Sequence, residues 1–247
     1  MENGLFQPPA GQQPFVHVAD ADTTRAFLAR VFTYMGLAMV ISGVMAWWFG
    51  TDMSMLDYLR SPETGKQTIL GWVALLAPLG LVFLMGGMVN RLSGAAMLGV
   101  FILYSALTGM SLSYIFLLYT KSSIGGIFFI TAALFGVMAV LGYTTKTDLT
   151  KLGSILMIGL IGIVIAGLAN AFIFKNGTMG YVLSMASVVI FTGLTAYDMQ
   201  KLKNMAGYVV NGTEIAQKMA LMGALSLYLD FLNLFLALLR LFGNRRD

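Results

Sequence analysis

The stretch Met219–Phe242, MALMGALSLYLDFLNLFLALLRLF, is apolar and long enough to cross a membrane, yet it carries an aspartate, Asp230, at its midpoint. A charge at bilayer depth costs about 2.5–3.5 kcal/mol on insertion scales. A helix made mostly of Leu, Ala and Phe accepts that cost only if the carboxyl group is protonated, paired or facing water. A second aspartate, Asp198, closes the preceding apolar segment. We expect the function to depend on these two carboxyl groups.

The composition of the whole chain is that of an integral membrane protein. Its 247 residues are 58% hydrophobic and 11% charged, against about 25% charged in a soluble domain. There is no cysteine and a single histidine, His17, which excludes thiolate chemistry and a histidine metal cluster. The basic residues are scattered through short loops, a pattern that reflects membrane topology rather than a nucleic-acid partner.

Seven stretches are long enough to cross about 30 Å of hydrocarbon, which predicts an all-α integral membrane fold. Because most connections are short, neighbouring spans should pack as one bundle. The expected spans are Val31–Phe49, Ile69–Asn90, Ala95–Leu118, Ile124–Thr144, Leu152–Phe174, Met179–Tyr197 and Met219–Leu241.

The chain divides into a polar N-terminal tail, residues 1–25, a seven-helix membrane domain, residues 26–242, and a short basic tail, residues 243–247. No connection is long enough for a further domain. Small residues recur at helix-contact spacing, as in the pair Ala95 and Gly99. Such a pair lets helices approach closely, and we expect it to serve packing within the bundle. The oligomeric state stays open.

The distribution of Lys and Arg predicts the orientation of the spans. Arg240, Arg245 and Arg246 would be exported by seven full spans, and keeping them inside would require the last segment to re-enter. A full span is the simpler interpretation. Eight basic residues lie on the N-terminal side, Arg25, Arg30, Arg91, Lys146, Lys151, Lys201, Lys203 and Lys218, against four in the opposite loops, Arg60, Lys66, Lys121 and Lys175. The expected location is the cell (inner) membrane, multi-pass, with a cytoplasmic N-terminus.

Polar residues on the last span form a stripe. Ser226, Asp230, Asn233 and Arg240 are separated by steps of four, three and seven, which keeps them on one helix face. A polar stripe on an apolar span usually faces the bundle interior or a water-filled path. The alternative is a cluster of interhelical hydrogen bonds that only locks the packing.

A third charged residue belongs to the same end of the bundle in the predicted topology. Arg91 is the only charged residue between Lys66 and Lys121. In the predicted topology it lies on the cytoplasmic side of the membrane, where the span that ends near Asp198 is followed by the span that contains Asp230. The sequence therefore permits a cluster of Arg91, Asp198 and Asp230 in the cytoplasmic half. An exposed ion pair between Asp198 and a neighbouring lysine, of little energetic value, is the alternative.

Two segments resemble the last two helices of the Bax inhibitor (TMBIM) family, namely TGLTAYDMQKLK at 192–203 and LSLYLDFLNLFLALLRLF at 225–242. The seven-span layout is also similar to that family, and to its bacterial members, over the chain after the tail. The resemblance implies a central C-terminal helix wrapped by the other six, and a pH-sensitive calcium leak. It also implies that Asp198 and Asp230 share a proton as a pH sensor. Arg91 matches, by position, the arginine that latches the first of these acids.

Physical chemistry suggests how such a gate would respond to pH. Two carboxyl groups brought together in a low dielectric cannot both ionise cheaply, so the pair should hold one proton between them. Arg91 would favour ionising Asp198 and would leave Asp230 as the proton carrier. Full protonation removes the attraction to Arg91, and full deprotonation makes the acids repel. Either change could open the bundle by itself. Of the two, we expect opening on acidification, through loss of the attraction between Arg91 and Asp198.

The transported ion would meet few ligands along this path. Ser226, Asn233 and Gln200 are candidate pore-lining residues, although Gln200 also fits a helix cap or interface group. Calcium prefers several oxygen ligands, and the chain contains no dedicated calcium loop. We therefore expect transient calcium passage near Asp198 and Asp230 without a high-affinity metal site or a cofactor.

Two other classes of function remain as alternatives. Some bacterial members of the resembled family bind and modulate a membrane-anchored ATP-dependent protease, so a non-conducting regulator of that protease or of another membrane protein is the main alternative. Intramembrane aspartyl proteases also use two aspartates on adjacent helices. They need a glycine-rich approach to the second acid, whereas Leu227, Tyr228 and Leu229 precede Asp230 here. We therefore expect no enzymatic activity.

Overall fold

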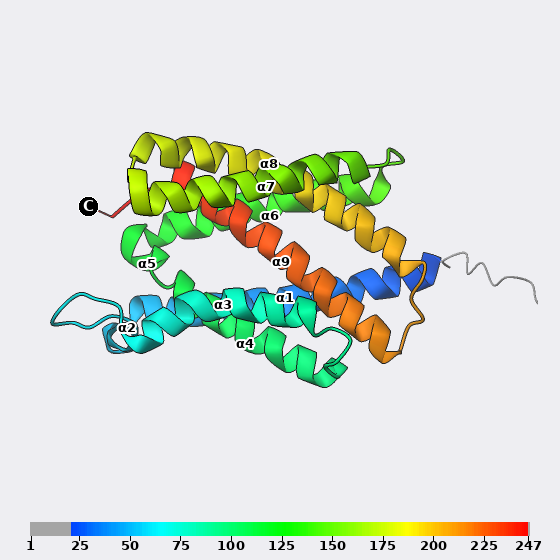
Figure 1. The fold of residues 1–247 in the computed structure, drawn as a ribbon, viewed down its shortest axis with the longest axis horizontal. Helices are drawn as coiled ribbons and strands as arrows, with labels where there is room; N and C mark the ends of the chain where they lie inside the picture. The colour runs from blue at the N-terminus through cyan, green and yellow to red at the C-terminus, as the bar shows by residue number, and fades with distance from the viewer. Residues whose placement is uncertain (1–20, 247) are drawn as a thin grey trace, which may run out of the picture.

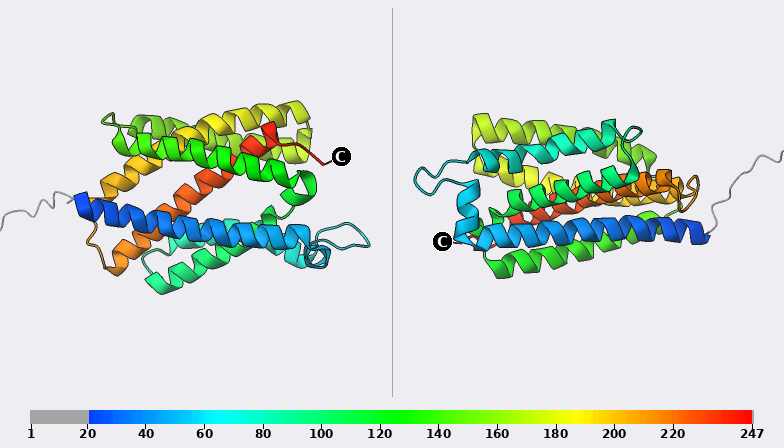
Figure 2. Two further views of the ribbon diagram at one scale, coloured as in Figure 1. Left: turned by 180° about the vertical axis from the view of Figure 1, so that it is seen from behind. Right: turned by 90° about the horizontal axis from the view of Figure 1, so that it is seen from below.

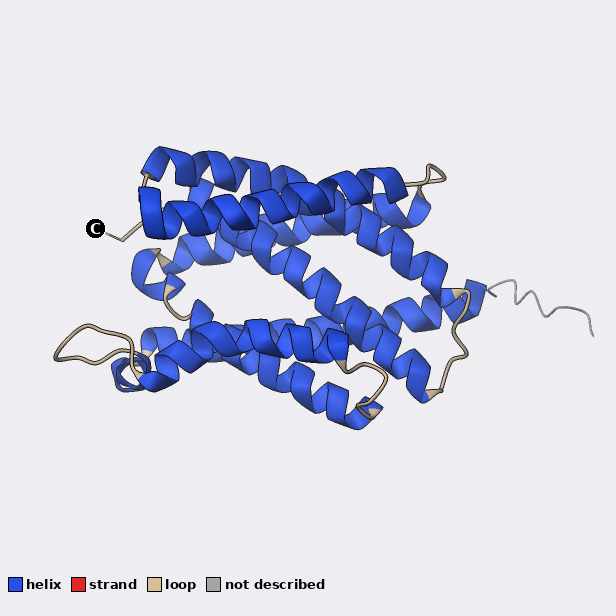
Figure 3. Cartoon of the chain, viewed as in Figure 1, coloured by secondary structure: helices blue, strands red, loops and turns tan. Residues whose placement is uncertain are grey.

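The computed structural model describes residues 21–246, and within them the chain is helical apart from short connections and two isolated β-bridges (Figures 1 and 3). Seven helical segments in this range are long and apolar enough to span a membrane, which confirms the predicted fold class. The helices are α1 (Ala21–Thr51), α2 (Met53–Leu59), α3 (Ile69–Gly87), α4 (Gly94–Leu112), α5 (Ile115–Leu118), α6 (Lys121–Thr144), α7 (Thr150–Ala169), the π-helical turn η1 (Asn170–Phe174), α8 (Gly177–Ala206) and α9 (Glu214–Phe242).

The third predicted span is divided in the structure into α4 and the short helix α5. At the break, the hydroxyl of Ser113 donates to the carbonyl of Met110 at 2.6 Å, a local bond that competes with helix continuation. The end of α1 also packs here, since a Cβ built on Gly50 would lie 2.8 Å from the Ser113 carbonyl oxygen. The predicted loop after α1 contains the helix α2, whose N-terminus is capped by Asp52 through the Ser54 amide at 2.9 Å.

Helix α9 crosses obliquely between two groups of helices, with α6, α7 and α8 on one side and α1, α3 and α4 on the other (Figures 1 and 2). In its apolar stretch 67% of the residues are buried, against 11–33% in the other six spans. Its main packing partners are α8, α1, α6 and α4, while α7 packs on α8 and α3 packs on α4. Enclosure of α9 by all six other spans stays a prediction.

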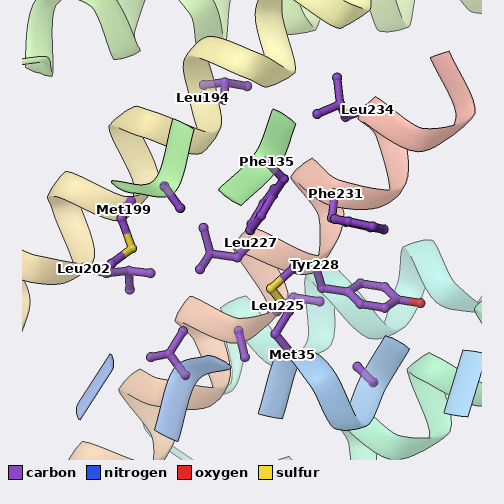
Figure 4. Packing of buried hydrophobic residues seen from close by; sticks show 14 of the residues in the cluster. Met35, Phe135, Leu194, Met199, Leu202, Leu225, Leu227, Tyr228, Phe231 and Leu234 are labelled. Atoms are coloured by element: carbon purple, nitrogen blue, oxygen red, sulfur yellow. The ribbon is translucent and has the colours of Figure 1, made fainter. Parts of the chain in front are cut away.

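The core is built around the middle of α9 (Figure 4). Leu227 and Tyr228 are fully buried, and Phe231 is 2% exposed. The ring of Phe231 meets the rings of Phe128 and Phe135 edge to face, with centroid distances of 5.4 and 5.6 Å. Since lipid is as apolar as these side chains, such close contacts and interhelical hydrogen bonds hold the helices together.

Close helix contacts occur at glycines other than the predicted pair. A Cβ on Gly142 of α6 would lie 2.2 Å from the Ala196 carbonyl oxygen of α8, so only glycine fits there. In contrast, Ala95 and Gly99 are exposed, and a Cβ on Gly99 would meet no atom within 4 Å. The prediction that this pair packs within the bundle is wrong, because the spacing of small residues does not determine which face they occupy.

The two ends of the described chain lie at opposite ends of the bundle (Figures 1 and 2). Helix α1 already begins at Ala21, so the last residues of the predicted polar tail are helical, and residues 1–20 lie outside the described range. The basic C-terminal tail docks beside α5, where the Asn244 carbonyl accepts from the Thr120 amide at 3.1 Å and the Arg246 guanidinium donates to the Phe116 carbonyl at 3.0 Å. The last segment is long and apolar enough for the full span of the simpler interpretation, and the crossing itself stays a prediction.

Candidate functional site

A side-chain hydrogen bond between Ser226 and Asp198 joins the two most extensively packed helices, α8 and α9. The hydroxyl of Ser226 donates to the carboxylate of Asp198, and both side chains are half-buried. Helix α8 continues to Ala206, about two turns beyond Asp198. The acid therefore lies inside the helix and against α9. It does not lie at the end of the span, where hydropathy placed it, and among residues 21–246 it does not form the exposed ion pair that was the alternative.

The second carboxyl group, on Asp230, lies one turn further along α9 from Ser226. It is 5% exposed, and among the described residues its Oδ2 atom has no hydrogen-bond partner. A buried polar atom without a partner costs free energy. The bundle therefore retains a carboxyl group that packing alone does not favour, which is typical of a functional group within a membrane.

Two cavities meet at these side chains. The smaller, of about 250 Å³, extends toward the α8–α9 connection and is lined by Lys201 and Met222 among others. The larger, of about 580 Å³, extends toward the C-terminal end of α9. Both are lined by Asp198, Ser226 and Leu229. Because these three residues line both spaces along the α8–α9 contact, we call them the partition.

The polar stripe of α9 faces the larger cavity, since Ser226, Asp230, Asn233 and Arg240 all line it. The side-chain amide of Asn233 donates to the carbonyl of Leu229 in its own helix at 2.8 Å, so Asn233 forms no bridge to a neighbouring helix. The four residues whose spacing indicated a common helix face therefore do share one face, and that face borders a cavity instead of packing directly against another helix.

One basic side chain lines each cavity, Lys201 the smaller and Arg240 the larger. Within residues 21–246 neither forms an ion pair with Asp198 or Asp230. Each cation thus offsets part of the negative potential of the carboxyl groups without neutralising either by contact.

Gln200 does not line either cavity, in contrast to its proposed pore-lining role. Its side-chain oxygen accepts from the Leu149 amide at 2.8 Å, and its side-chain nitrogen donates to the Thr147 carbonyl at 2.9 Å. Both polar groups of this 9% exposed residue are therefore used to fasten the α6–α7 connection to α8. This geometry matches the alternative interpretation of Gln200 as an interface group.

Arg91 is exposed in the connection between α3 and α4. In the described part of the chain it has no ion pair with Asp198 or with Asp230. The latch that the resemblance implied is not formed in this conformation, and in its place Asp198 has the Ser226 hydroxyl. The role of Arg91 as a latch stays a prediction.

A second polar contact, which sequence reasoning missed, joins three helices on the opposite side of α9. The hydroxyl of Ser42 in α1 donates to the Ser105 carbonyl of α4 at 2.8 Å. A serine has one hydroxyl proton, so in the 2.5 Å contact between Ser42 and Tyr228 the tyrosine is the donor. The sequence did contain a signal for this contact. Tyr228 lies two residues before Asp230, and this spacing places the two side chains on opposite faces of one helix.

A metal centre is not found within residues 21–246, where no group of three or more His, Cys, Asp or Glu side chains is arranged to hold an ion. The oxygen atoms available at the partition come from Asp198, Ser226 and Asp230, with the Asn233 amide beyond them. Such a sparse set suits a cation that passes rather than one that is stored.

Comparisons with known proteins agree with this architecture. Residues 24–247 match the family model described as "Inhibitor of apoptosis-promoting Bax1". The inner membrane protein YbhL of Escherichia coli strain K12 is 40% identical over 245 residues, which cover 99% of this chain and 97% of that protein. An uncharacterized protein of Borreliella burgdorferi is 44% identical over 221 residues, covering 90% and 93%. An uncharacterized protein of Rickettsia prowazekii is 42% identical over 225 residues, covering 90% and 91%.

Proposed function

The chain belongs to the Bax inhibitor family of membrane proteins, and we propose that it is a pH-sensitive calcium leak channel. Its seven apolar helices and its inner-membrane relative support a multi-pass location in the inner membrane. A cytoplasmic N-terminus, expected from the Lys and Arg counts, is part of the proposal. The gate is the contact between Asp198 and Ser226, with Asp230 as the neighbouring proton carrier.

One observation carries this proposal, namely that two cavities in series share Asp198, Ser226 and Leu229. A path along α8 and α9 is closed at the point where the serine hydroxyl meets the carboxylate. Separation of the two helices at this contact would join spaces of about 250 and 580 Å³. A local separation at one contact would thus make the path continuous, which is what a gate requires.

Protonation of Asp198 changes the strength of the closing contact. A hydroxyl donating to an ionised carboxylate forms a bond about twice as strong as one between neutral groups. Acidification replaces the first kind of bond by the second, so it weakens closure, and the leak increases as pH falls. This sign agrees with the response expected from the sequence, although the partner of Asp198 is Ser226 and not Arg91.

Asp230 supplies the second part of the pH response. Its unpartnered carboxyl group lies on the larger cavity, one turn from the partition. Asp198 also lines this cavity, and two carboxyl groups that approach each other in a low dielectric favour a single shared negative charge. Proton uptake or release by one acid therefore changes the charge that the other can carry. A passing calcium ion, attracted to that charge, would compete with protons for the same site.

The test is calcium flux into proteoliposomes between about pH 5 and pH 8, for the wild-type protein beside Asp230→Asn. We expect flux that rises on acidification, and a smaller rise in Asp230→Asn, which keeps the response of the Ser226–Asp198 contact and loses the contribution of Asp230. Asp57→Asn is the matched control, because Asp57 is an exposed acid on α2, outside the path. It should leave the pH profile unchanged. No flux at any pH would overturn the proposal and would favour a non-conducting regulator of a membrane-anchored protease or another membrane protein.

The proposal contains no enzymatic step. In an intramembrane aspartyl protease an extended substrate must reach the backbone beside the second acid. Here the two residues at that position, Leu227 and Tyr228, are fully buried against neighbouring helices (Figure 4). A cleavage assay that detected hydrolysis lost in both Asp198→Asn and Asp230→Asn would contradict this part of the proposal.

A further inference from the structure

A third space, distinct from the two along α8 and α9, lies at the end of the bundle where α2, α3 and α5 meet. It has a volume of about 700 Å³. We call it the hairpin pocket, because one wall is the loop between α2 and α3 (Figure 1). It is lined by Arg60, Gly65, Lys66, Gln67, Trp72, Tyr114, Leu117 and Leu118.

The loop that forms this wall is a hydrogen-bonded hairpin. Arg60 and Gln67 form an antiparallel bridge, and the Ser61 amide donates to the Lys66 carbonyl at 2.9 Å. The turn is closed at Gly65, whose φ of 64° lies in the left-handed region that glycine adopts without strain. Arg60 and Lys66 therefore lie on the two opposed sides of one hydrogen-bonded hairpin, which fixes the backbone that carries both basic side chains.

Two further bonds orient the polar side chains of the pocket. The Nε group of Arg60 donates to the Gly65 carbonyl at 2.5 Å, which fixes the plane of the guanidinium and leaves its terminal nitrogens for another partner. The hydroxyl of Tyr114 donates to the side-chain oxygen of Gln67 at 2.7 Å. The amide nitrogen of Gln67 thereby remains as a donor. The bond to Tyr114 also fastens the hairpin to the segment just before α5.

The chemical character of the pocket is that of an anion site. Arg60, Lys66 and Gln67 present hydrogen-bond donors, two of them charged, and no acidic side chain lines the space. In the described chain neither Arg60 nor Lys66 forms an ion pair. Guanidinium and ammonium groups without carboxylate partners suit the oxygen atoms of a phosphate.

The position of the pocket points to a lipid as the source of that phosphate. Trp72, in the first turn of α3, is 52% exposed, and Leu118 is 58% exposed. Trp47 and Trp48, at the same end of α1, are also exposed. Exposed tryptophans at the ends of spans mark the level of lipid headgroups. The basic wall therefore lies at headgroup level, and the apolar wall adjoins the acyl region.

We propose that the hairpin pocket binds the phosphate of an anionic phospholipid headgroup through Arg60, Lys66 and Gln67. The glycerol and the first part of the acyl chains lie against Trp72, Leu117 and Leu118. This site is independent of the gate at Asp198, because the two share no lining residue. The bound lipid would brace the hairpin against α5 at the end of the bundle.

The test uses Trp72 as a reporter inside the pocket. In a Trp47→Phe, Trp48→Phe background Trp72 is the one remaining tryptophan of three. The purified full-length protein in detergent is titrated with short-chain phosphatidylglycerol carrying brominated acyl chains, which quench the emission of nearby tryptophan. We expect saturable quenching that Arg60→Gln combined with Lys66→Gln weakens at least about tenfold, because two charge-assisted contacts are lost.

The control removes the same charge elsewhere at this end of the bundle. Lys121→Gln combined with Lys175→Gln should change the affinity by less than about twofold, since both side chains are exposed and line no part of the pocket. Equal weakening by both pairs, or equal affinity for brominated phosphatidylcholine, would overturn the proposal. So would inorganic phosphate that competes at the same concentration as the lipid, because the site would then be one for a free anion.

A single substitution keeps the test interpretable if the double variant does not fold. The ammonium group of Lys66 has no hydrogen-bond partner in the described chain, so Lys66→Gln removes a charge without breaking the hairpin. It should weaken phosphatidylglycerol binding several-fold at an unchanged melting temperature. Unchanged affinity in this variant would contradict the assignment of Lys66 to the phosphate.

Discussion

Replacing Ser226 by alanine removes one oxygen atom from the partition between the two cavities. The hydroxyl of Ser226 donates to the carboxylate of Asp198, and a hydrogen bond to a charged group contributes about 1.5–3 kcal/mol. Each 1.4 kcal/mol corresponds to about a factor of ten in an equilibrium constant. Loss of this bond should therefore lower the ratio of closed to open protein by about ten- to one-hundred-fold.

The expected result depends on how rarely the wild-type channel is open. A minor conformation is commonly populated at about 0.1–10%. From the lower half of that range, Ser226→Ala should raise the calcium leak at neutral pH by about tenfold or more. The assay is the initial rate of calcium entry into proteoliposomes loaded with a calcium indicator, at matched protein density. The pH dependence of the leak should also become shallower, because acid can no longer weaken a bond that is absent.

The matched control is Ser187→Ala. Ser187 lines the same larger cavity, but its hydroxyl donates at 2.7 Å to the Leu183 carbonyl of its own helix. This substitution enlarges the cavity by one oxygen atom without removing a bond between α8 and α9, so the leak should stay within about twofold of wild type. The reasoning is refuted if Ser226→Ala leaves the leak unchanged, or if both variants raise it equally.

Three further substitutions test the packing and the role of arginine. Gly142→Ala should lower the stability measured by thermal unfolding in detergent by about 1–3 kcal/mol, because the added methyl group meets the α8 backbone. The control Gly136→Ala should leave this stability unchanged, because a methyl group at that position meets no atom within 4 Å. Gln200→Leu should also cost about 1–3 kcal/mol in the same assay through two lost hydrogen bonds, whereas Asn204→Leu, at an exposed position of the same helix, should change little. Arg91→Gln should leave the ratio of calcium flux at about pH 5.5 to that at about pH 7.5 within twofold, since Arg91 forms no ion pair with either aspartate; a flattened ratio would restore the predicted latch.

The membrane-spanning architecture could be predicted from the sequence because hydropathy depends on composition alone. The common face of Ser226, Asp230 and Asn233 could also be predicted, since the spacing of residues on one helix determines their relative direction. Both predictions concern properties of a single segment. They required no knowledge of how one helix is rotated against another.

The contact between Ser226 and Asp198 is a property of two helices and could not be obtained in this way. Hydropathy places the end of the sixth span near Tyr197, because Gln200, Lys201 and Lys203 follow. The helix continues to Ala206, since Leu202 and Ala206 are buried against the bundle.

The extension of α8 explains the corrections at both Gln200 and Asp198. It places Gln200 beside the α6–α7 connection, and it brings Asp198 against α9 instead of leaving it at a helix end. Tertiary packing therefore decided the partners of residues whose individual importance the sequence had indicated.

The identity of the group that contacts Asp198 determines how strongly pH can act on the gate. An arginine latch would lose nearly all of its attraction when Asp198 is protonated, whereas a hydroxyl retains about half of its bond to a neutral acid. From a bond of about 1.5–3 kcal/mol, protonation of Asp198 thus removes about 0.75–1.5 kcal/mol, or about a factor of 4–13 in the ratio of closed to open protein. A wild-type response to acid much steeper than this would require a contribution from Asp230, and Asp230→Asn should then reduce the response to the range set by Ser226 alone.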